Sequence, residues 1–484
     1  AGYGAAMASP SPLSARELQA RLEAGEPLQL VDVREPMEME LAQLAQPVIH
    51  LPLGSSQAWI GQLPALLDPE RPVVVGRDPR ASGRMAWEGV VSALMACGHE
   101  VIDLGVVSTP VVQHALQRLD AAGGIAISAS HNSAEWNALR FLGPRGTYLS
   151  TAEAGELLDI YHLRKFRYVE WDKLGGQKSD DGALDRYIDD LAAVFDLPGL
   201  RGFRVVVDCC NGTSALILRR VMERYGLNLV LINERVEGVQ FAHEPTTSAR
   251  MVELQLGPLM QPLKADAGFL FDVDSDRVAM ADELGRGVSE EMMLPLLADH
   301  QLTRGPGKIV ITNLSSSALL EEVAAAHGGR VLRVPVGRQA AMDALAAYKP
   351  EQIAVAGEGT GAVMMPQFRF IYDGIASMLA VLTMMKERGR TLGQLLGEYP
   401  QYSILKGEVR LESPRVPELL IDLLGAYPDG KIDRTDGLRV TWPDRWFHVR
   451  VSHTEPIIRV ICEQRGAPPQ ELFETLMDKA RSYS

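Results

Sequence analysis

The chain has 484 residues, of which 46% are hydrophobic, and its 48 lysines and arginines stand against 62 aspartates and glutamates, a formal net charge of −14. This length and apolar content predict three or four domains, each with its own core. The negative charge argues against nucleic acid and anionic membranes as partners, because their phosphates would repel the protein, so phosphate binding would depend on local groups of arginines.

The cysteines and the apolar runs indicate a cytoplasmic protein. Cys97, Cys209, Cys210 and Cys462 show neither metal-binding nor disulfide spacing, so we interpret them as reduced core thiols. The longest apolar run, residues 374–385, is too short to span a bilayer, and the first residues lack a basic region followed by an apolar one. We therefore expect no membrane segment.

The first 70 residues differ in kind from the rest of the chain. Residues 13–18, 28–36 and 49–53 resemble the first half of a rhodanese-like domain. A rhodanese needs a cysteine thiolate, its sulfur acceptor, on the loop after the next strand, and residues 76–80 (Gly-Arg-Asp-Pro-Arg) contain none. We expect no sulfurtransferase activity, and we interpret the segment either as packing where a first strand and helix would lie or as a fusion.

From residue 71 the chain alternates between strand patterns and helix patterns. This alternation predicts right-handed crossover units and mixed or parallel sheets, hence an α/β fold. We expect three similar modules, over residues 71–198, 199–303 and 304–402, and a C-terminal α+β domain over residues 403–484. The expected strands are 72–76, 100–105, 124–129, 227–233, 267–271, 278–281, 330–336, 446–451 and 457–462, with others beginning at 203, 308 and 353, and the expected helices are 83–97, 110–119, 214–225, 317–327, 338–347 and 469–482.

The first candidate site follows the strand predicted at residues 124–129. Residues 128–132 read Ser-Ala-Ser-His-Asn, and a serine on a loop at the carboxyl end of a strand is where α/β folds place chemistry. The alternative is an ordinary turn in which His131 and Asn132 close hydrogen bonds, and the pentapeptide taken alone favours the turn.

Asp272, Asp274 and Asp276 are the most informative feature of the sequence. Three carboxylates within five residues repel one another unless a hard cation gathers them, and the apolar strands predicted on both sides place them in a tight loop. A helix–loop–helix calcium site is excluded, because its sixth position requires a glycine and is Arg277 here. A solvated acidic turn is the remaining alternative to a metal site.

A third motif, residues 357–361 (Gly-Glu-Gly-Thr-Gly), imitates a dinucleotide-binding fingerprint. That interpretation is weak, because Glu358 would face the pyrophosphate and residues 364–366 (Met-Met-Pro) do not open a helix. A carboxylate between glycines is better suited to hydrogen bonds with sugar hydroxyls.

The fourth motif, residues 450–459, places the hydroxyls of Ser452 and Thr454 between Arg450 and Arg459. Guanidinium groups and hydroxyl donors together are typical of a phosphate-binding cradle. The alternative is a surface loop whose arginines pair with nearby acidic groups.

The order and content of these four loops resemble the α-D-phosphohexomutase superfamily, enzymes that move a phosphoryl group between the 1- and 6-positions of a hexose. Its phosphoserine, magnesium, sugar and phosphate loops resemble residues 128–132, 272–277, 357–361 and 450–459, and residues 76–83, 103–105, 312–315 and 373–374 resemble the branch that contains phosphoglucosamine mutases and phosphomannomutases. The resemblance implies an isomerase whose domains surround a central cleft, with small hexose phosphates as its ligands.

The resemblance also implies a role for each motif residue. Ser130 would carry the phosphoryl group, donate it to a hexose monophosphate, and recover it from the other end of a hexose 1,6-bisphosphate, which acts as intermediate and activator. One Mg²⁺ would be held by Ser130 and the three aspartates. The implied catalytic residues are Ser130, His131, Arg140 and Arg277, and the implied substrate-binding residues are Arg77, Arg80, Glu358, Thr360, Arg450, Ser452, Thr454 and Arg459.

Two departures from the family pattern bear on activity. The family's usual N-terminal segment, Phe-Gly-Thr-(Ser/Asp)-Gly-x-Arg-Gly, is absent, and Arg140 stands where a lysine, a candidate general acid/base, is common. A guanidinium stays protonated and cannot act as a base.

The sequence leaves two hypotheses about function. One is a magnesium-dependent phosphohexomutase for glucosamine, mannose or glucose phosphate, which the joint presence of the serine, the three aspartates and the loop arginines favours. The other is a catalytically impaired sugar-phosphate-binding or regulatory protein.

Overall fold

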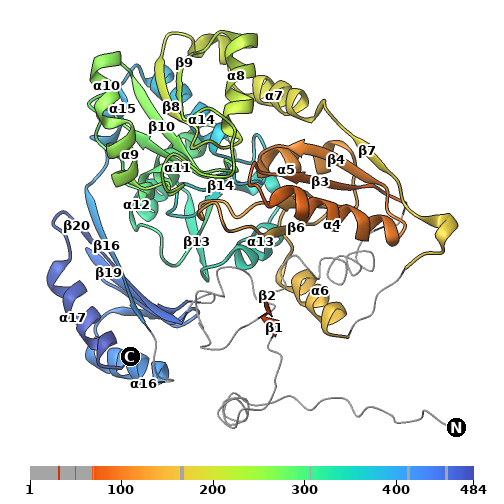
Figure 1. Cartoon of the computed structure of the whole chain (residues 1–484). Coiled ribbons are helices and arrows are strands. Elements are labelled where there is room, and N and C mark those ends of the chain that lie inside the picture. The colour runs from red at the N-terminus through yellow and green to blue at the C-terminus, as the bar shows by residue number, and fades with distance from the viewer. Residues whose placement is uncertain are drawn as a thin grey trace, which may run out of the picture.

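The computed structural model describes residues 31–32, 49–50, 68, 70–163, 168–305, 307–410, 415–452 and 456–483. Within the predicted rhodanese-like segment, β1 (Val31–Asp32) and β2 (Ile49–His50) form a parallel pair. Apart from residues 68 and 70, the rest of that segment lies outside the described residues. The remainder of the chain forms three α/β modules and a C-terminal domain (Figure 1).

The first module is a five-stranded sheet with helices on both faces. Val73 and Val75 share a core cluster with α4, whereas the intervening Val74 belongs to the cluster that contains α5, because successive side chains of a strand face opposite sides. Coverage of both faces is what a parallel sheet requires. The elements are β3 (Val73–Arg77), α4 (Gly83–Ala96), β4 (Val101–Val106), α5 (Thr109–Arg118), β5 (Gly123–Ile127), β6 (Leu139–Leu142), α6 (Thr151–Leu163), β7 (Gln177–Ser179) and α7 (Ala183–Val194).

The second and third modules are four-stranded sheets of the same kind. The second consists of β8 (Arg204–Asp208), α8 (Ser214–Tyr225), β9 (Asn228–Ile232), α9 (Ala249–Gln255), α10 (Gly257–Leu263), β10 (Ala267–Phe271) and β11 (Val278–Ala281). The third consists of β12 (Ile309–Asn313), α12 (Leu319–Ala326), β13 (Arg330–Val334), α13 (Arg338–Ala346), β14 (Ile353–Gly357), β15 (Val363–Met364), α14 (Gly374–Arg388) and α15 (Leu392–Leu396). Helix α11 (Met293–Arg304) packs against α12 and β14, so it contributes to the third module although it precedes the predicted boundary at residue 304.

The three sheets share one strand order. In each sheet an antiparallel strand lies at one edge, next to the parallel strand that comes third along the chain. The first and then the second parallel strand follow across the sheet. The orders are β6-β5-β3-β4, β11-β10-β8-β9 and β15-β14-β12-β13. The predicted mixed sheets are confirmed. The link between the third parallel strand and the antiparallel strand therefore has the same position in every module, and these links contain residues 128–132, 272–277 and 358–361.

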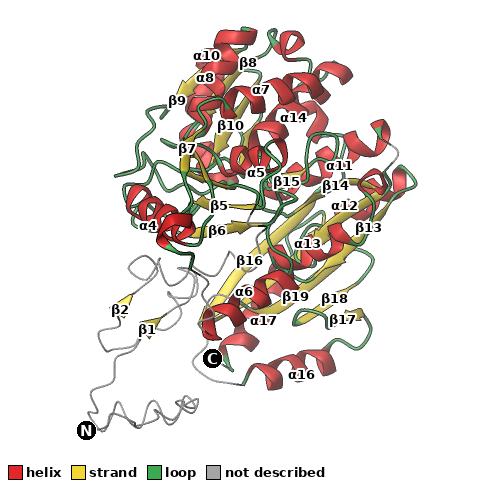
Figure 2. Cartoon of the chain, turned by 90° about the vertical axis from the view of Figure 1, so that its right-hand side faces the viewer, coloured by secondary structure: helices red, strands yellow, loops and turns green. Residues whose placement is uncertain are grey.

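The C-terminal domain has a different architecture. Its five strands form an antiparallel sheet in the order β16-β20-β19-β18-β17, and Leu419 and Leu423 of α16 share its core with Leu476 and Ala480 of α17. Figure 2 shows both helices beside this sheet. The elements are β16 (Tyr402–Arg410), α16 (Val416–Ala426), β17 (Lys431–Asp433), β18 (Leu438–Thr441), β19 (Arg445–Val451), β20 (Ile457–Arg465) and α17 (Gln470–Arg481).

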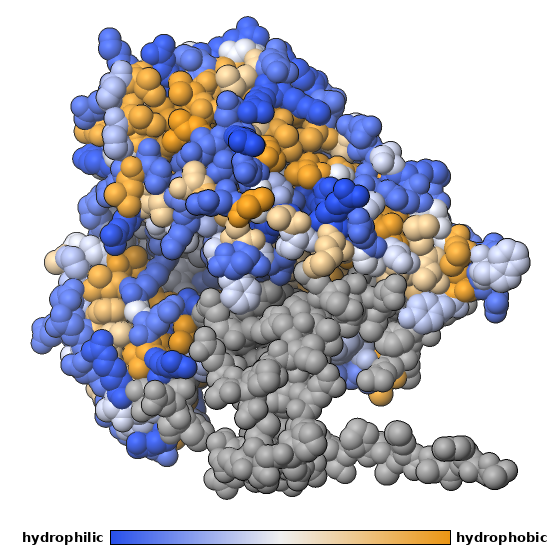
Figure 3. Space-filling model, viewed as in Figure 1, coloured by the Kyte–Doolittle hydropathy of each residue, from blue (hydrophilic) through white to orange (hydrophobic). Residues whose placement is uncertain are grey.

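The cysteines lie in the core, and the surface mixes polar and apolar side chains. All four cysteines are buried, as predicted for core thiols. Among the described residues, no helix combines the length and the apolar composition that crossing a bilayer requires. The face drawn in Figure 3 mixes polar and apolar side chains, and the apolar ones gather mainly in its upper half, where Figure 1 shows the second module.

Candidate functional site

The loop after β5 holds the Ser130 hydroxyl in a constrained backbone. Ser130 has φ of +51°, a left-handed conformation that few residues other than glycine adopt, and it is 2% exposed. Its N–H donates to Oγ of Ser128 at 3.0 Å, and Ser128 donates in turn to Asp78 at 2.7 Å. Arg80 pairs with Asp78 and donates to the carbonyl oxygens of Ser130, at 3.1 Å, and Asn132. The side chain of Arg80, predicted to bind substrate, is thus buried beneath the serine loop and holds it in place.

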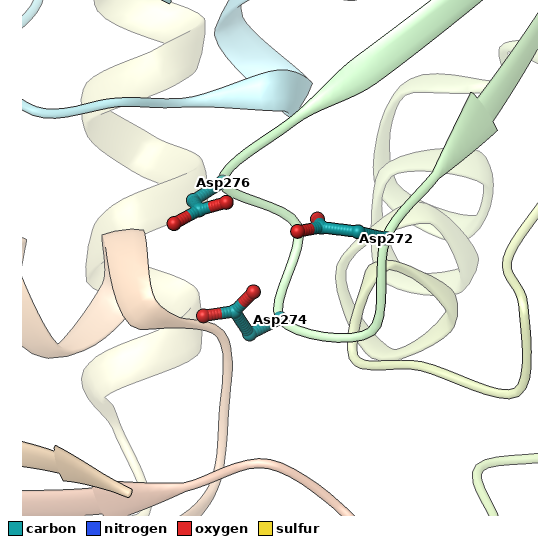
Figure 4. A group of neighbouring side chains, drawn as sticks. All are labelled: Asp272, Asp274 and Asp276. Atoms are coloured by element: carbon teal, nitrogen blue, oxygen red, sulfur yellow. The ribbon is translucent and has the colours of Figure 1, made fainter. Parts of the chain in front are cut away.

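The three aspartates of the β10–β11 loop gather around one point. Asp272, Asp274 and Asp276 are at most 1% exposed, and one oxygen of each lies within 4.8 Å of the others. Figure 4 shows their carboxylates directed toward one another. Oγ of Ser130 donates to Asp272 at 2.5 Å and to Asp276 at 3.2 Å. The serine of the first module and the acidic loop of the second therefore form one site, although 142 residues separate Ser130 from Asp272.

The carboxylate oxygens of this loop could serve as ligands for a cation. Burial and the two neighbouring carboxylates raise the pKa of Asp272 well above its ordinary value. Burial acts in the same direction on Asp276, but Arg140, Arg338 and Arg277 outweigh it and lower the pKa of that carboxyl. Oδ1 of Asp274 is buried and accepts no hydrogen bond from the described residues. A buried acceptor without a donor, next to the oxygens of two further carboxylates, fits a hard divalent ion such as Mg²⁺.

Three arginines surround the aspartates. Nη1 of Arg140 donates to Asp274 at 2.8 Å and to Asp276 at 2.7 Å. Nη2 of Arg338 lies 3.4 Å from Asp276, and Nε of Arg277 lies 3.8 Å from the same residue. Sequence analysis missed Arg338. Its contact with Asp276 spans 62 residues, so the local sequence offered no signal for it.

His131 is a neutral imidazole next to the serine. Its Nδ1 is buried and has no hydrogen-bond partner among the described residues. The positive charge of Arg277 and the burial of the ring lower the pKa of His131 to about 3. The ring is therefore unprotonated at neutral pH, and its low pKa makes it a weak base while Arg277 is its dominant charged neighbour.

The sugar-binding candidate loop lies against the acidic loop. The N–H of Val278, at the start of β11, donates to the carbonyl of Gly361 at 3.3 Å. Glu358 accepts from the Tyr372 hydroxyl at 3.3 Å, and Oγ1 of Thr360 is buried without a hydrogen-bond partner among the described residues. Glu358 and Thr360 thus lie on a loop that contacts the strand following the three aspartates.

The arginines of the C-terminal domain lie side by side. Arg450 of β19 and Arg459 of β20 are directly paired in the antiparallel register. Nε of Arg450 donates to Asp436 at 2.9 Å, and Asp436 also accepts from the N–H of Val336 at 2.9 Å, which connects this domain to the segment leading to Arg338. Ser452 is buried, and Thr454 lies outside the described residues.

Arg77 is the remaining predicted ligand. It is the last residue of β3, at the carboxyl end of the central strand of the first sheet, and its Nη1 is buried with no hydrogen-bond partner among the described residues. A buried guanidinium nitrogen of this kind is suited to an anionic ligand.

The acidic loop rests on the N-terminus of α14. The N–H of Gly374 donates to the carbonyl of Ser275 at 3.0 Å, and a Cβ at residue 374 would lie only 3.0 Å from that oxygen. Asp373 caps the helix by accepting from the N–H of Ala376 at 2.9 Å, and it also accepts from the Tyr187 hydroxyl. Burial raises the pKa of Asp373 to about 6.

Replacement of Asp373 by asparagine is expected to change the pH dependence of stability. A raised pKa means that the stability contributed by Asp373 is fully present below its unfolded value of 3.8 and is lost as pH rises through about 6. Asparagine can retain the cap and is neutral throughout. The difference in melting temperature between Asp373→Asn and the unmodified protein should therefore shift in favour of the variant between pH 4 and pH 7. The corresponding change in the free energy of unfolding is at most roughly 3 kcal/mol.

Scanning calorimetry across that range measures the effect. Asp172→Asn, at an exposed position, is the control and should show no such trend. A difference for Asp373→Asn that stays constant with pH would contradict the expectation.

Comparison with known proteins gives consistent matches over most of the chain. Three family models match: phosphoglucomutase/phosphomannomutase alpha/beta/alpha domain I at residues 55–167, domain II at 185–285 and domain III at 289–402. A phosphoglucomutase/phosphomannomutase of Thermococcus kodakarensis is 31% identical over 421 residues, which cover 86% of this chain and 88% of that protein.

Two solved structures share the fold. A phosphoglucomutase/phosphomannomutase family protein from Burkholderia thailandensis superposes with a TM-score of 0.75 at 22% identity and covers 93% of this chain and 97% of its own. Aspergillus fumigatus N-acetylphosphoglucosamine mutase, solved in complex with GlcNAc-6P and magnesium, gives a TM-score of 0.58 at 16% identity over 89% of this chain and 97% of its own.

Proposed function

Because the chain belongs to the phosphoglucomutase/phosphomannomutase family within the α-D-phosphohexomutase superfamily and is a phosphohexomutase, we propose that it exchanges a phosphoryl group between the 1- and 6-oxygens of a hexose through Ser130. The observation that carries this proposal is the position of Oγ of Ser130, 2.5 Å from Asp272 and 3.2 Å from Asp276. A phosphoryl group on that oxygen would lie beside both the three aspartates and the three arginines.

In the proposed reaction, a hydroxyl oxygen of the hexose monophosphate attacks the phosphorus on Ser130. The new P–O bond forms as the bond to Oγ breaks, which leaves a hexose 1,6-bisphosphate. After the sugar turns over, Oγ takes the phosphoryl group from its other end. Arg277 and Arg338 hold the phosphoryl oxygens. Because Arg140 stays protonated, transfer of the proton of the attacking hydroxyl is assigned to His131, whose low pKa the negative phosphoryl group beside it would raise.

The three aspartates and Ser130 would hold one Mg²⁺. This ion supplies partial neutralisation of the phosphoryl charge, which lowers the barrier to in-line transfer. Support comes from the all-oxygen donor set and from the magnesium in the Aspergillus structure. The burial of all four cysteines in the described core is consistent with reduced thiols, which supports a cytoplasmic location.

Recognition of the sugar is assigned to the loops of the third module and the C-terminal domain. Glu358 and Thr360 bind hydroxyls, and Arg450, Ser452, Thr454 and Arg459 bind the phosphate that is not being transferred. Arg77 binds phosphate at the end of β3, and Arg80 positions the serine loop. Since the distant phosphate is bound in the same way in both orientations of the bisphosphate, one site serves both ends of the substrate.

A coupled assay with glucose 1-phosphate, mannose 1-phosphate and glucosamine 1-phosphate tests the proposal. We expect conversion of at least one of them to its 6-phosphate, with stimulation by a catalytic amount of the matching 1,6-bisphosphate. Binding of all three sugars without turnover would instead support the hypothesis of a sugar-phosphate-binding protein.

Arg450→Gln is expected to weaken binding more than it slows the chemical step. The guanidinium would contact the phosphate in ground state and transition state alike, so its loss should raise KM by roughly ten- to a hundredfold, the equivalent of about 1.5–3 kcal/mol, with a smaller change in kcat. Steady-state kinetics measure both constants. Arg445→Gln is the matched control, because Arg445 is an exposed residue of the same strand. A fall in kcat with KM unchanged would argue against a phosphate-binding role.

A further inference from the structure

Three arginines lie close to the three aspartates of the acidic loop. Arg140 contacts Asp274 and Asp276, and Arg277 and Arg338 each approach Asp276 as well. The formal charges of three aspartates and three arginines cancel. A divalent cation that approaches this loop therefore meets little net attraction before any phosphate is present.

Arg140 is the member of this set that is most firmly fixed. It lies on β6, in the first module, and reaches across to the acidic loop of the second, with only 10% of its side chain exposed. The same Nη1 that donates to Asp274 and Asp276 also lies 3.3 Å from the Tyr148 hydroxyl and 3.5 Å from Oγ1 of Thr109. Arg140 occupies one oxygen of each of two carboxylates and leaves Oδ1 of Asp274 without a partner among the described residues.

We propose that Arg140 is a built-in counter-cation that keeps divalent metal affinity low until Ser130 is phosphorylated. This inference rests on the proposed function, because it takes Ser130 as the phosphoryl carrier. A phosphoserine adds a charge of about −1.5 to −2, and Oγ of Ser130 lies within hydrogen-bond distance of two of the metal-binding aspartates. Phosphorylation thus converts a balanced site into a net negative one. The metal is then retained when there is a phosphoryl group to transfer.

Metal binding can be measured directly with Mn²⁺ by electron paramagnetic resonance, on full-length protein and without turnover. The phosphorylated form is prepared with hexose 1,6-bisphosphate and the dephosphorylated form with excess hexose monophosphate, and intact mass reports the state of each sample. For the unmodified protein we expect at least tenfold tighter Mn²⁺ binding by the phosphorylated form. Arg140→Gln should tighten binding to the dephosphorylated form at least tenfold and so reduce the difference between the two forms.

The control is Arg84→Gln, which makes the same change in net charge at an arginine whose side chain is 78% exposed on α4. It should leave both Mn²⁺ affinities unchanged. Equal affinities of the two forms of the unmodified protein, or an Arg140→Gln variant that binds Mn²⁺ no more tightly than the unmodified protein, would overturn the inference. If intact mass shows no phosphorylated form, the proposed function fails instead, and the Arg140→Gln measurement on the unphosphorylated protein still decides the role of Arg140.

Discussion

Replacement of Ser130 by alanine is expected to abolish phosphoryl transfer to the protein and to reduce turnover by a factor on the order of 10⁴ or more, because the variant has no oxygen on which the covalent intermediate can form. Incubation with labelled hexose 1,6-bisphosphate followed by intact mass measures the first effect. The coupled mutase assay measures the second.

The serine loop itself should survive this change. The contacts of Asp78, Ser128 and Arg80 hold the backbone of residue 130 and do not require its hydroxyl. Ser133→Ala, three residues further along the same loop, is the matched control and should incorporate label normally. Stoichiometric labelling of Ser130→Ala would remove Ser130 from the mechanism, whatever the remaining activity.

Removal of divalent metal is expected to stop turnover, and Mg²⁺ should restore it. Asp272, Asp274 and Asp276 are buried and offer oxygens within 4.8 Å of one another, and the phosphoryl charge beside them needs a cation during transfer. Activity after EDTA treatment and desalting, measured against added Mg²⁺, tests this expectation.

The substitution Asp274→Asn weakens the proposed metal site from the side of the protein, as EDTA does by removing the ion. The amide keeps the size of the side chain and one oxygen for Thr109 and Arg140, but it lowers the charge and the ligand strength of the site. We expect a loss of roughly 10²–10³-fold in kcat/KM and a higher Mg²⁺ concentration for half-maximal activity. Asp181→Asn, at an exposed position, is the control. Full activity of Asp274→Asn in the presence of EDTA would exclude a metal held by this loop.

The parts of the fold with strong local patterns were predictable from the sequence. Apolar runs bounded by turn residues indicated β3, β10 and β12, and their helices followed from the alternation. The short antiparallel strands β6 and β15 were not recognised, because Arg140 interrupts the apolar residues of β6 and β15 has only two residues. The four-residue strand β11 was recognised from its unbroken apolar run. The position of β6 and β15 depends on pairing with a neighbouring strand, which local sequence does not encode.

The site also contains residues that the sequence pointed to and residues that it did not. The three aspartates stand in a motif whose chemistry is visible in the sequence, whereas the role of Ser130 followed from the resemblance of all four loops to the superfamily. Arg338 reaches Asp276 across 62 residues, and Asp436 meets Val336 across 100, so neither contact has a local signature. Arg80 was singled out from the sequence, but for a different role from the one that its contacts indicate. Its motif indicated a ligand for the substrate, whereas its guanidinium serves the carbonyl groups of the serine loop.

The shared strand order of the three modules has an evolutionary consequence. A single ancestral unit copied twice would bring three equivalent hairpin tips to one place without the invention of a new fold. Each copy could then specialise, one as nucleophile, one as cation holder and one as carbohydrate reader, while the strands beneath stayed under the same packing constraints. Duplication followed by division of labour among the loops would account for how groups so distant along the polypeptide come to meet at one site.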